Sequence, residues 1–280
     1  MRRIATRTGE LAVLEWGPQG GEVVLCLHGF PDVADGFEPL ATLLAAAGYR
    51  VVAPYLRGYA PSTLDGPHRV DQLGEDLLAL ADAVSPDARV RVVGHDWGAT
   101  AVYVAAARSP HRIERAVTLA VPHPAAFLHN ARAQPAQLGR SWYMLFFQLP
   151  LAAEWALRRR SFSLVTRLWH DWSPGWEPSA EHLAKVRACL EVSLPAPIEY
   201  YRTMARSVLS GPPARAAVVP VPTLVLHGEK DGCVGAGLGK GQERFFTGAL
   251  EAEVLPEVGH FLHLERPAVV AERVLSWFRA

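Results

Sequence analysis

The most constraining feature of this sequence is a short segment at residues 92–99, Val-Val-Gly-His-Asp-Trp-Gly-Ala. An apolar strand leads into it, a Gly-x-Asp-x-Gly turn follows, and a helix rich in small residues leaves it. Such a sharp turn from strand to helix is strained, and it pushes its central side chain, here Asp96, into a pocket. The segment therefore predicts an α/β fold with a reactive group at the carboxyl end of one strand.

Aspartate at the centre of this turn, where serine is more usual, changes the chemistry that is available. A carboxylate that attacks an acyl carbon gains little, because the product is a reactive anhydride. A carboxylate that attacks an sp3 carbon bearing a leaving oxygen or halogen makes an ordinary ester, which water can hydrolyse. The turn favours alkyl transfer to Asp96 over peptide or ester cleavage, and it leaves the leaving group undefined.

Strand and helix signals alternate on both sides of this turn. Apolar runs bounded by turn residues predict strands at 11–16, 22–27, 50–53, 89–93, 116–120, 222–227 and 252–255. Helical spacing of apolar residues predicts helices at 37–47, 70–84, 98–108, 242–246 and 267–279. Repeated strand–helix units with short connections indicate a mostly parallel sheet covered by helices on both faces.

The alternation stops between residues 125 and 213. This stretch is dense in Leu, Arg, Trp and Tyr, lacks β-branched alternation, and is interrupted by several prolines. Its spacing predicts four helices, at 137–148, 151–169, 179–193 and 197–209. We therefore predict an α/β core made of residues 1–124 and 214–280, interrupted by a helical domain at 125–213.

Composition argues against several classes of function. With 28 basic and 28 acidic residues the formal net charge is zero, so no long-range field favours nucleic acid or an anionic membrane. No segment has the length and apolarity of a membrane span, and the N-terminus lacks the apolar region of a signal peptide, so we expect a cytoplasmic protein. The three cysteines form no CxxC pair, and the sequence predicts neither a disulfide framework nor a metal site.

Two further residues complete a candidate site around Asp96. His260 lies in a Gly-His-Phe loop after the strand at 252–255, and Asp231 lies in a Glu-Lys-Asp loop after the strand at 222–227. Open parallel sheets place their sites at the carboxyl ends of strands, where these loops meet. We predict that Asp96 is the nucleophile, that His260 activates water, and that Asp231 orients His260.

Phe30 and Trp97 are predicted to form an oxyanion hole. Phe30 lies in a His-Gly-Phe-Pro loop after the strand at 22–27, and Trp97 directly follows Asp96. Their backbone N–H groups are expected to converge on a carboxyl oxygen of Asp96. There they would stabilise the tetrahedral adduct that forms when water attacks the ester.

Five segments, HGFP, RGYAPS, GHDWGA, EKD and GHFLHLERP, together resemble the epoxide hydrolases of the α/β-hydrolase fold. The resemblance covers essentially the full length of the chain. It implies a hydrolase that opens epoxides to vicinal diols without a metal or organic cofactor, with the helical domain as a cap over the pocket. The GHDWG segment is shared with haloalkane dehalogenases, so it does not by itself decide between the two families.

An epoxide oxygen leaves as an alkoxide and needs an acid, for which a neutral tyrosine hydroxyl is suited. By resemblance, Tyr143 in the 141–148 segment and Tyr201 in a Tyr-Arg-x-Met segment match the two acid positions of the family. Trp142 and Phe146 are expected to line an apolar substrate pocket together with Trp97. The implied partners are a small apolar epoxide and water, and the Arg- and Trp-rich cap leaves a homodimer open.

Two other functions remain open at this point. A haloalkane dehalogenase would use the same Asp-His-Asp set with indole or amide donors for halide, although Phe30 stands where those enzymes place asparagine. A small-molecule binding protein on the same scaffold would bind ligands without turnover.

Overall fold

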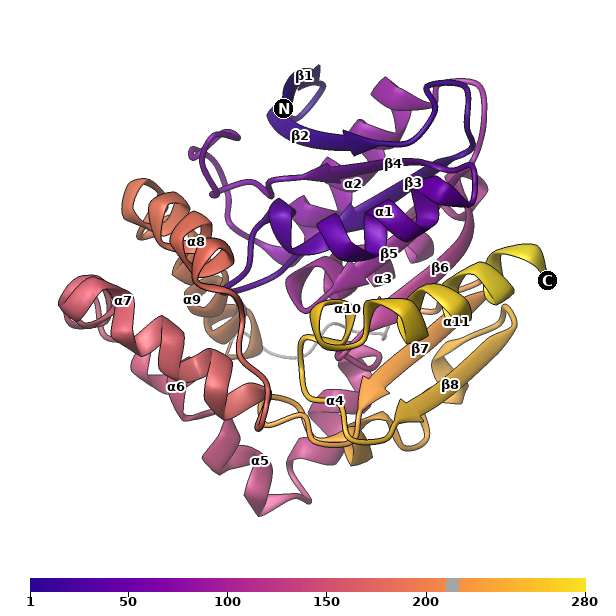
Figure 1. Cartoon of the computed structure of the whole chain (residues 1–280). Coiled ribbons are helices and arrows are strands. Elements are labelled where there is room, and N and C mark those ends of the chain that lie inside the picture. The colour runs from indigo at the N-terminus through magenta and orange to yellow at the C-terminus, as the bar shows by residue number, and fades with distance from the viewer. Residues whose placement is uncertain (210–216) are drawn as a thin grey trace.

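The computed structural model describes residues 1–209 and 217–280, and the core of the fold is a single sheet (Figure 1). Its eight strands have the order β1-β2-β4-β3-β5-β6-β7-β8. The strand β2 runs antiparallel to β1 and β4, and all other pairs are parallel, which confirms the predicted mostly parallel sheet. The strands are β1 (Arg2–Thr6), β2 (Gly9–Trp16), β3 (Val23–Leu27), β4 (Arg50–Pro54), β5 (Val90–His95), β6 (Ile113–Leu119), β7 (Thr223–Gly228) and β8 (Leu250–Leu255).

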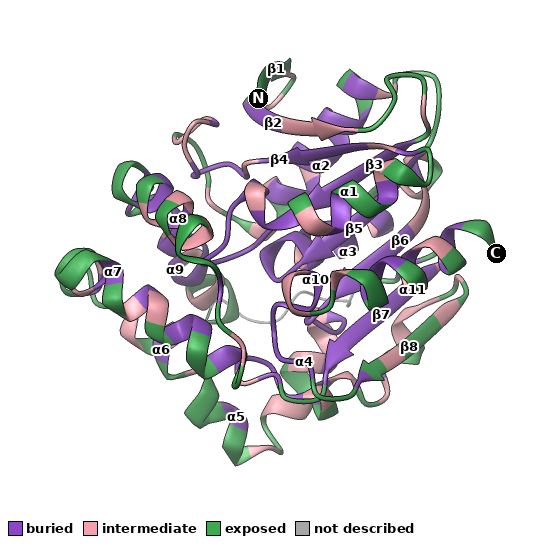
Figure 2. Cartoon of the chain, in the orientation of Figure 1, coloured by how far each residue is buried: buried purple, intermediate pink, exposed green. Residues whose placement is uncertain are grey.

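Helices cover both faces of this sheet. One face packs on α2 (Val70–Val84) and α3 (Trp97–Arg108), and the other on α1 (Glu38–Ala46) and α11 (Pro267–Arg279). Alternate residues of β3 therefore enter different cores: Leu25 faces the α2–α3 side and Cys26 faces the α1–α11 side. Burial on both faces explains why β3 and β5 read as continuous apolar runs (Figure 2).

A helical insertion at residues 124–209 connects β6 to the second part of the sheet. It contains α4 (Pro124–Ala131), α5 (Pro135–Arg140), α6 (Trp142–Phe146), α7 (Ala152–Trp172), α8 (Ala180–Ser193) and α9 (Ala196–Leu209). In Figure 1 these helices lie beyond the carboxyl ends of the parallel strands, where loops such as the one before α10 (Leu262–Glu265) also meet. The predicted boundary after residue 124 falls at the start of α4, and the one after residue 213 lies outside the described residues.

Several elements differ from the sequence prediction. The helix predicted at 137–148 is two helices, because the chain bends at Ser141 and starts a new axis in α6. The strand β1 was not predicted, since it is a short edge strand with two arginines. The helix α4 was not predicted either, because Pro124 suggests a break in the helix, although proline is well tolerated in the first turn, where it lies here. The predicted helix at 242–246 is a short 3-10 turn.

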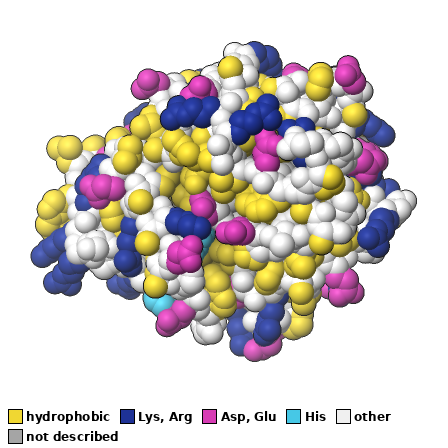
Figure 3. Space-filling model, turned by 45° about the horizontal axis from the view of Figure 1, so that its top comes forward, with side chains coloured by type: hydrophobic (Ala, Val, Ile, Leu, Met, Phe, Trp, Pro, Cys, Tyr) yellow, Lys and Arg dark blue, Asp and Glu magenta, His cyan; other side chains and the backbone are white. Residues whose placement is uncertain are grey.

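The surface carries charges of both signs without large single-sign regions on the face drawn in Figure 3. There Lys and Arg side chains lie among Asp and Glu side chains, while hydrophobic side chains gather toward the middle of the face. This distribution fits the equal numbers of basic and acidic residues, 28 of each. Within residues 1–209 and 217–280, no helix combines the length and the apolarity needed to cross a lipid bilayer.

A buried ion pair joins the loop after β4 to α2. Arg57 donates from Nε and Nη2 to the two carboxylate oxygens of Asp76, and both donor–acceptor distances are 2.8 Å. The Arg57 side chain is 5% exposed and the Asp76 side chain 4%. The Tyr200 hydroxyl of α9 donates to the carbonyl oxygen of Arg57 at 2.9 Å, which ties the insertion to the same loop. A bidentate pair in this position is geometrically specific, and neither charge can regain water without local unfolding.

We predict that Asp76→Ala destabilises the fold by about 3–5 kcal/mol, because it leaves the Arg57 guanidinium buried without its partner. The matched control is Asp71→Ala on the same helix, whose ion pair with Arg69 is more than half exposed on both sides. That control should change stability by no more than about 1 kcal/mol. Urea unfolding followed by circular dichroism measures both, and equal losses in the two variants would contradict the prediction.

Candidate active site

Asp96 occupies a strained turn between β5 and α3. Its backbone has φ 52° and ψ −115°, a combination that side-chain-bearing residues rarely adopt and that neighbouring structure must enforce. A Cβ atom added to Gly98 would overlap the carbonyl of Leu27, and one added to Gly94 would overlap the carbonyl of Gly98. The Gly-x-Asp-x-Gly pattern is therefore needed for the close approach of α3 to β3, and it directs the Asp96 carboxylate out of the sheet.

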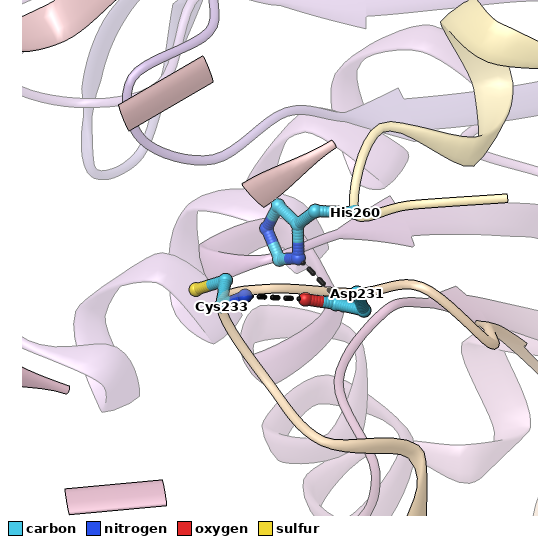
Figure 4. Close-up of side chains that lie close together, drawn as sticks. All are labelled: Asp231, Cys233 and His260. Atoms are coloured by element: carbon cyan, nitrogen blue, oxygen red, sulfur yellow. Dashed lines mark hydrogen bonds and ion pairs between the residues drawn. The ribbon is translucent and has the colours of Figure 1, made fainter. Parts of the chain in front are cut away.

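The structure brings the three predicted residues together at this carboxylate. His260 and Asp231 are fully buried, and His260 Nδ1 lies 2.8 Å from Asp231 Oδ2 (Figure 4). His260 Nε2 lies 3.9 Å from Asp96 Oδ2. The other oxygen of Asp231 accepts backbone N–H bonds from Cys233 at 2.7 Å and Val234 at 2.8 Å. Asp231 is thus fixed by its own loop and presents one oxygen to the imidazole.

The pKa values of Asp96, Asp231 and His260 are set by two opposing effects, burial and the charges of neighbouring groups. Burial disfavours the charged forms of all three residues. For His260, the Asp231 and Asp96 carboxylates outweigh burial, so its pKa is raised. For Asp231, His260 and His227 outweigh burial and hold the pKa of the carboxyl well below its usual range. For Asp96 burial prevails, and its pKa is raised despite His260 and the N–H groups of Phe30 and Trp97.

The two predicted oxyanion-hole residues also lie at Asp96. The backbone N–H of Phe30 donates to Asp96 Oδ1 at a distance of 2.8 Å. The backbone N–H of Trp97 acts on the same carboxylate and favours its charged form. These donors are held in position before negative charge develops on the carboxyl oxygen, which is the arrangement that stabilises an oxyanion. The Phe30–Pro31 peptide bond is cis.

Tyr143 of α6 and Tyr201 of α9 reach the site from the insertion. Both are nearly fully buried, and their rings meet edge to face with centroids 5.6 Å apart. The Tyr143 hydroxyl lies 3.3 Å from Cys233 Sγ, whereas the buried Tyr201 hydroxyl has no hydrogen-bond partner among the described residues. Burial, with the charge of Asp96 among the further causes, raises the pKa of each phenol well above its ordinary value. Both hydroxyls are therefore neutral donors at physiological pH.

The two predicted pocket residues, Trp142 and Phe146, do not join this group. They line a surface hollow with Trp155 of α7, and Trp142 is 37% exposed. Residues four apart share a face of a helix, so Trp142 and Phe146 project together, while Tyr143 and Phe147 form the inward pair. Phe147 is fully buried and packs on the rings of Phe30 and Tyr201, with centroids 5.4 and 5.2 Å apart. Phe147 thus occupies the place that the sequence prediction gave to Phe146.

Sequence reasoning also missed the polar contacts that join the insertion to the catalytic loops. Gln137 of α5 is buried, donates from Nε2 to the Cys233 carbonyl at 2.8 Å and accepts from the Gly235 N–H at 3.0 Å. At the end of α7, the Trp172 carbonyl and the Ser173 hydroxyl both accept from the His260 N–H, at 3.1 and 3.0 Å. A glutamine or serine within a helical segment carries no local signal of such distant partners.

Cys233 is a further unpredicted member of the site. One ligand atom from each of Asp231, Cys233 and His260 lies within 4.8 Å of the others, and all three residues are buried. Burial and the charges of Asp231 and Asp96 raise the pKa of the Cys233 thiol well above its ordinary value. The thiol is consequently protonated in the resting site, where it contacts Tyr143.

Comparison with known proteins places the chain in a family. The sequence profile of the alpha/beta hydrolase fold matches residues 22–267. The chain is 31% identical over 274 residues to Epoxide hydrolase 3 of Xenopus tropicalis, an alignment that covers 94% of this chain and 73% of that protein. The chain therefore belongs to the α/β-hydrolase fold family and, within it, to the epoxide hydrolases, as the sequence motifs predicted.

Solved structures of epoxide hydrolases share the fold. The Bacillus megaterium epoxide hydrolase, solved in complex with an inhibitor, superposes with a TM-score of 0.88 at 24% identity and 100% coverage of both chains. Epoxide Hydrolase A from Mycobacterium thermoresistibile gives a TM-score of 0.85 at 25% identity, covering 100% of this chain and 98% of that chain. These likenesses confirm the predicted α/β-hydrolase fold.

We predict that Asp96→Asn and Asp231→Asn each lower the pKa of His260, because each removes a negative charge that favours the imidazolium. The effect of Asp231→Asn should be the larger, since that carboxylate is also hydrogen-bonded to the ring. Glu272→Gln, on the exposed outer face of α11, is the control and should leave the pKa unchanged. NMR titration of the His260 ring measures all three, and a pKa that rises in either Asn variant would contradict the assignment.

Proposed function

We propose that this chain hydrolyses epoxides to vicinal diols through an alkyl ester on Asp96. The observation that carries the proposal is that two buried, neutral phenols lie at the same site as the Asp96 carboxylate. This carboxylate in turn faces the His260–Asp231 pair. A carboxylate nucleophile suits attack on an sp3 carbon, and phenols suit the protonation of a departing alkoxide. Kinship with epoxide hydrolases supports the same reaction.

In the first step, Tyr143 and Tyr201 hydrogen-bond the epoxide oxygen and Asp96 attacks a ring carbon from the opposite side. The carbon–oxygen bond of the ring breaks, and one phenol transfers its proton to the alkoxide. A phenol whose pKa is raised by burial stays protonated until the alkoxide develops, so its donation strengthens in the transition state. The product of this step is a β-hydroxyalkyl ester on Asp96.

In the second step, His260 takes a proton from water and the hydroxide attacks the carboxyl carbon of Asp96. Asp231 keeps the His260 ring in place through the 2.8 Å contact at Nδ1 and balances the charge of the imidazolium. The N–H groups of Phe30 and Trp97 stabilise the oxyanion. Its collapse expels the diol oxygen, which takes the proton from the His260 imidazolium, and the proton of the new Asp96 carboxyl group returns to the tyrosinate left by the first step.

We also propose that the helical insertion acts as the cap of the site and that the substrate is a small apolar epoxide. The side chains around Asp96 and the two phenols are aromatic: Phe30, Trp97 and Phe147 all contact the Tyr201 ring, with centroids between 4.8 and 5.7 Å away. Such a lining desolvates the reacting carbon and favours hydrocarbon substituents over charged ones.

One observation favours a second candidate function, haloalkane dehalogenation. The indole Nε1 of Trp97 is buried beside the Tyr201 phenol and makes no hydrogen bond of normal geometry among the described residues, and such an N–H can bind a leaving halide. The phenols favour the epoxide, because a halide needs no proton. Halide release from bromoalkanes, compared with diol formation from aryl epoxides, separates the two functions, and binding without turnover of either would identify a non-catalytic protein.

The proposal predicts the origin of the oxygen in the first diol. In a single turnover with excess enzyme in heavy-oxygen water, the diol should carry no label, because its new oxygen comes from the Asp96 carboxylate. The label should instead appear in the Asp96 carboxyl group, and in the diol only over further turnovers. Mass spectrometry of the diol and of the peptide containing Asp96 measures both, and immediate labelling of the diol would show direct hydration.

The Tyr143→Phe/Tyr201→Phe double variant should slow ring opening by roughly 10²–10⁴-fold, the usual contribution of a positioned general acid. The matched control is Tyr200→Phe, on the same helix as Tyr201, because the Tyr200 hydroxyl donates to the Arg57 carbonyl and not into the site. The rate of ester formation under single-turnover conditions is the measurement, with circular dichroism to check folding. Unchanged ring opening in the double variant would remove both phenols from the mechanism.

A further inference from the structure

The outer surface of the insertion carries an aromatic hollow that the proposed chemistry does not use. Trp142 and Phe146 of α6 line it together with Trp155 of α7, around a space of about 340 Å³. In Figure 1 these two helices lie at the outer edge of the molecule, on the side away from the sheet. Trp155 is 62% exposed. Large apolar side chains gathered at a surface mark binding sites, and the volume lies in the range of roughly 300–1,000 Å³ that is typical of small-molecule sites.

Two arginines give the hollow a positive charge. Arg159 and Arg160 complete its lining, which contains no carboxylate among the described residues. The guanidinium carbon of Arg159 lies 4.7 Å from the centre of the Trp155 ring. The preceding Arg158 is paired with Glu191, whereas neither Arg159 nor Arg160 forms an ion pair with a carboxylate in the part of the chain that the structure describes. Two guanidinium groups are therefore left to bind an external anion.

The charge of the chain is unevenly divided between the insertion and the core. Residues 124–209 contain ten Lys and Arg against six Asp and Glu, although the whole chain has 28 of each kind. The core accordingly carries the balancing excess of acidic residues. The zero net charge of the chain does not describe this surface, where the local field favours an anion.

A strained turn borders the hollow. In α7 the backbone leaves the helical conformation from Arg159 to Phe162. Arg160, Ser161 and Phe162 have φ between 50° and 61°, in the left-handed region that side-chain-bearing residues rarely adopt. Phe162 is buried, so packing holds the turn in place. Backbone strain of this kind concentrates at ligand-binding sites and switch regions.

We propose that this hollow is a binding site for a planar aromatic carboxylate. The rings of Trp142, Phe146 and Trp155 offer faces on which an aromatic ligand can stack. The guanidinium groups of Arg159 and Arg160 can hold its carboxylate through paired N–H···O bonds, a geometry that a lysine would not provide. Binding is non-covalent, and the charge of the ligand selects it over a neutral molecule of the same shape.

This site is separate from the catalytic one. Trp142 and Phe146 lie on the outer face of α6, whereas Tyr143 and Phe147 are buried on its inner face. The aromatic acid is therefore a second ligand, which binds without contact to Asp96.

The location of binding is tested with 2-naphthoate by NMR of the wild-type chain, which has eight tryptophan indole N–H groups. Trp→Phe variants assign the individual signals. The acid should shift the signals of Trp142 and Trp155 and leave that of Trp97, beside Asp96, in place. A shift of the Trp97 signal without shifts at Trp142 and Trp155 would put the acid in the catalytic site and overturn the inference.

The role of charge is tested by calorimetry with the same probe. The Arg159→Gln/Arg160→Gln variant should bind 2-naphthoate at least about tenfold more weakly, because it loses the charge-assisted hydrogen bonds. Arg158→Gln is the matched control and should bind as the wild type does, since its guanidinium bonds Glu191 and does not line the hollow. Neutral 2-naphthamide should also bind the wild type at least about tenfold more weakly than the acid.

Equal affinity for the acid in the double variant and the wild type, or equal affinity of the wild type for the amide and the acid, would refute the site. The substituted arginines are exposed, so the fold is expected to survive, and circular dichroism checks it. Neither measurement involves turnover, so its outcome is independent of the proposed epoxide hydrolysis.

Discussion

The whole site depends on one strained backbone position. Asp96, at φ 52° and ψ −115°, is held there because α3 approaches β3 so closely that a side chain on Gly98 would overlap the Leu27 carbonyl. The strand that carries it, β5, lies inside the sheet between β3 and β6. Parallel strands on either side therefore deliver their loops to the same carboxylate: Phe30 arrives after β3, Asp231 after β7 and His260 after β8. Without the strained turn, the other residues would meet around no reactive group.

The helical insertion is joined to the catalytic loops by buried hydrogen bonds. Besides its two tyrosines, Gln137 bonds the loop that follows Asp231, and the end of α7 accepts the His260 N–H. Buried hydrogen bonds of this kind are strong and leave costly unsatisfied groups when broken. A displacement of the insertion would therefore disturb the histidine and its aspartate as well as the phenols. Both steps of the proposed reaction therefore depend on the same contacts between the insertion and the core.

The sequence predicts best what is encoded locally. Asp96, Asp231 and His260 each follow a strand in a short glycine-containing loop, so neighbouring residues reveal them. The orientation of α6 is different, because the bend at Ser141 resets the helix and decides that Tyr143 and Phe147, and not Trp142 and Phe146, face inward. Gln137 is less visible still, since its partner at Cys233 lies 96 residues away in the chain. Such contacts come from how two helices meet a loop, which no single segment specifies.

The two carboxylates that flank His260 have opposite fates in the proposed cycle. In the resting site the charge of Asp96 helps to raise the pKa of the imidazole, which favours the protonated ring, and a protonated ring cannot take a proton from water. Esterification removes that charge, so the pKa of His260 falls and the neutral ring that must activate water is favoured. Asp231 stays ionised throughout, because its pKa is held low by its histidine partners. Alkylation of Asp96 thus prepares His260 for the one step in which it accepts a proton.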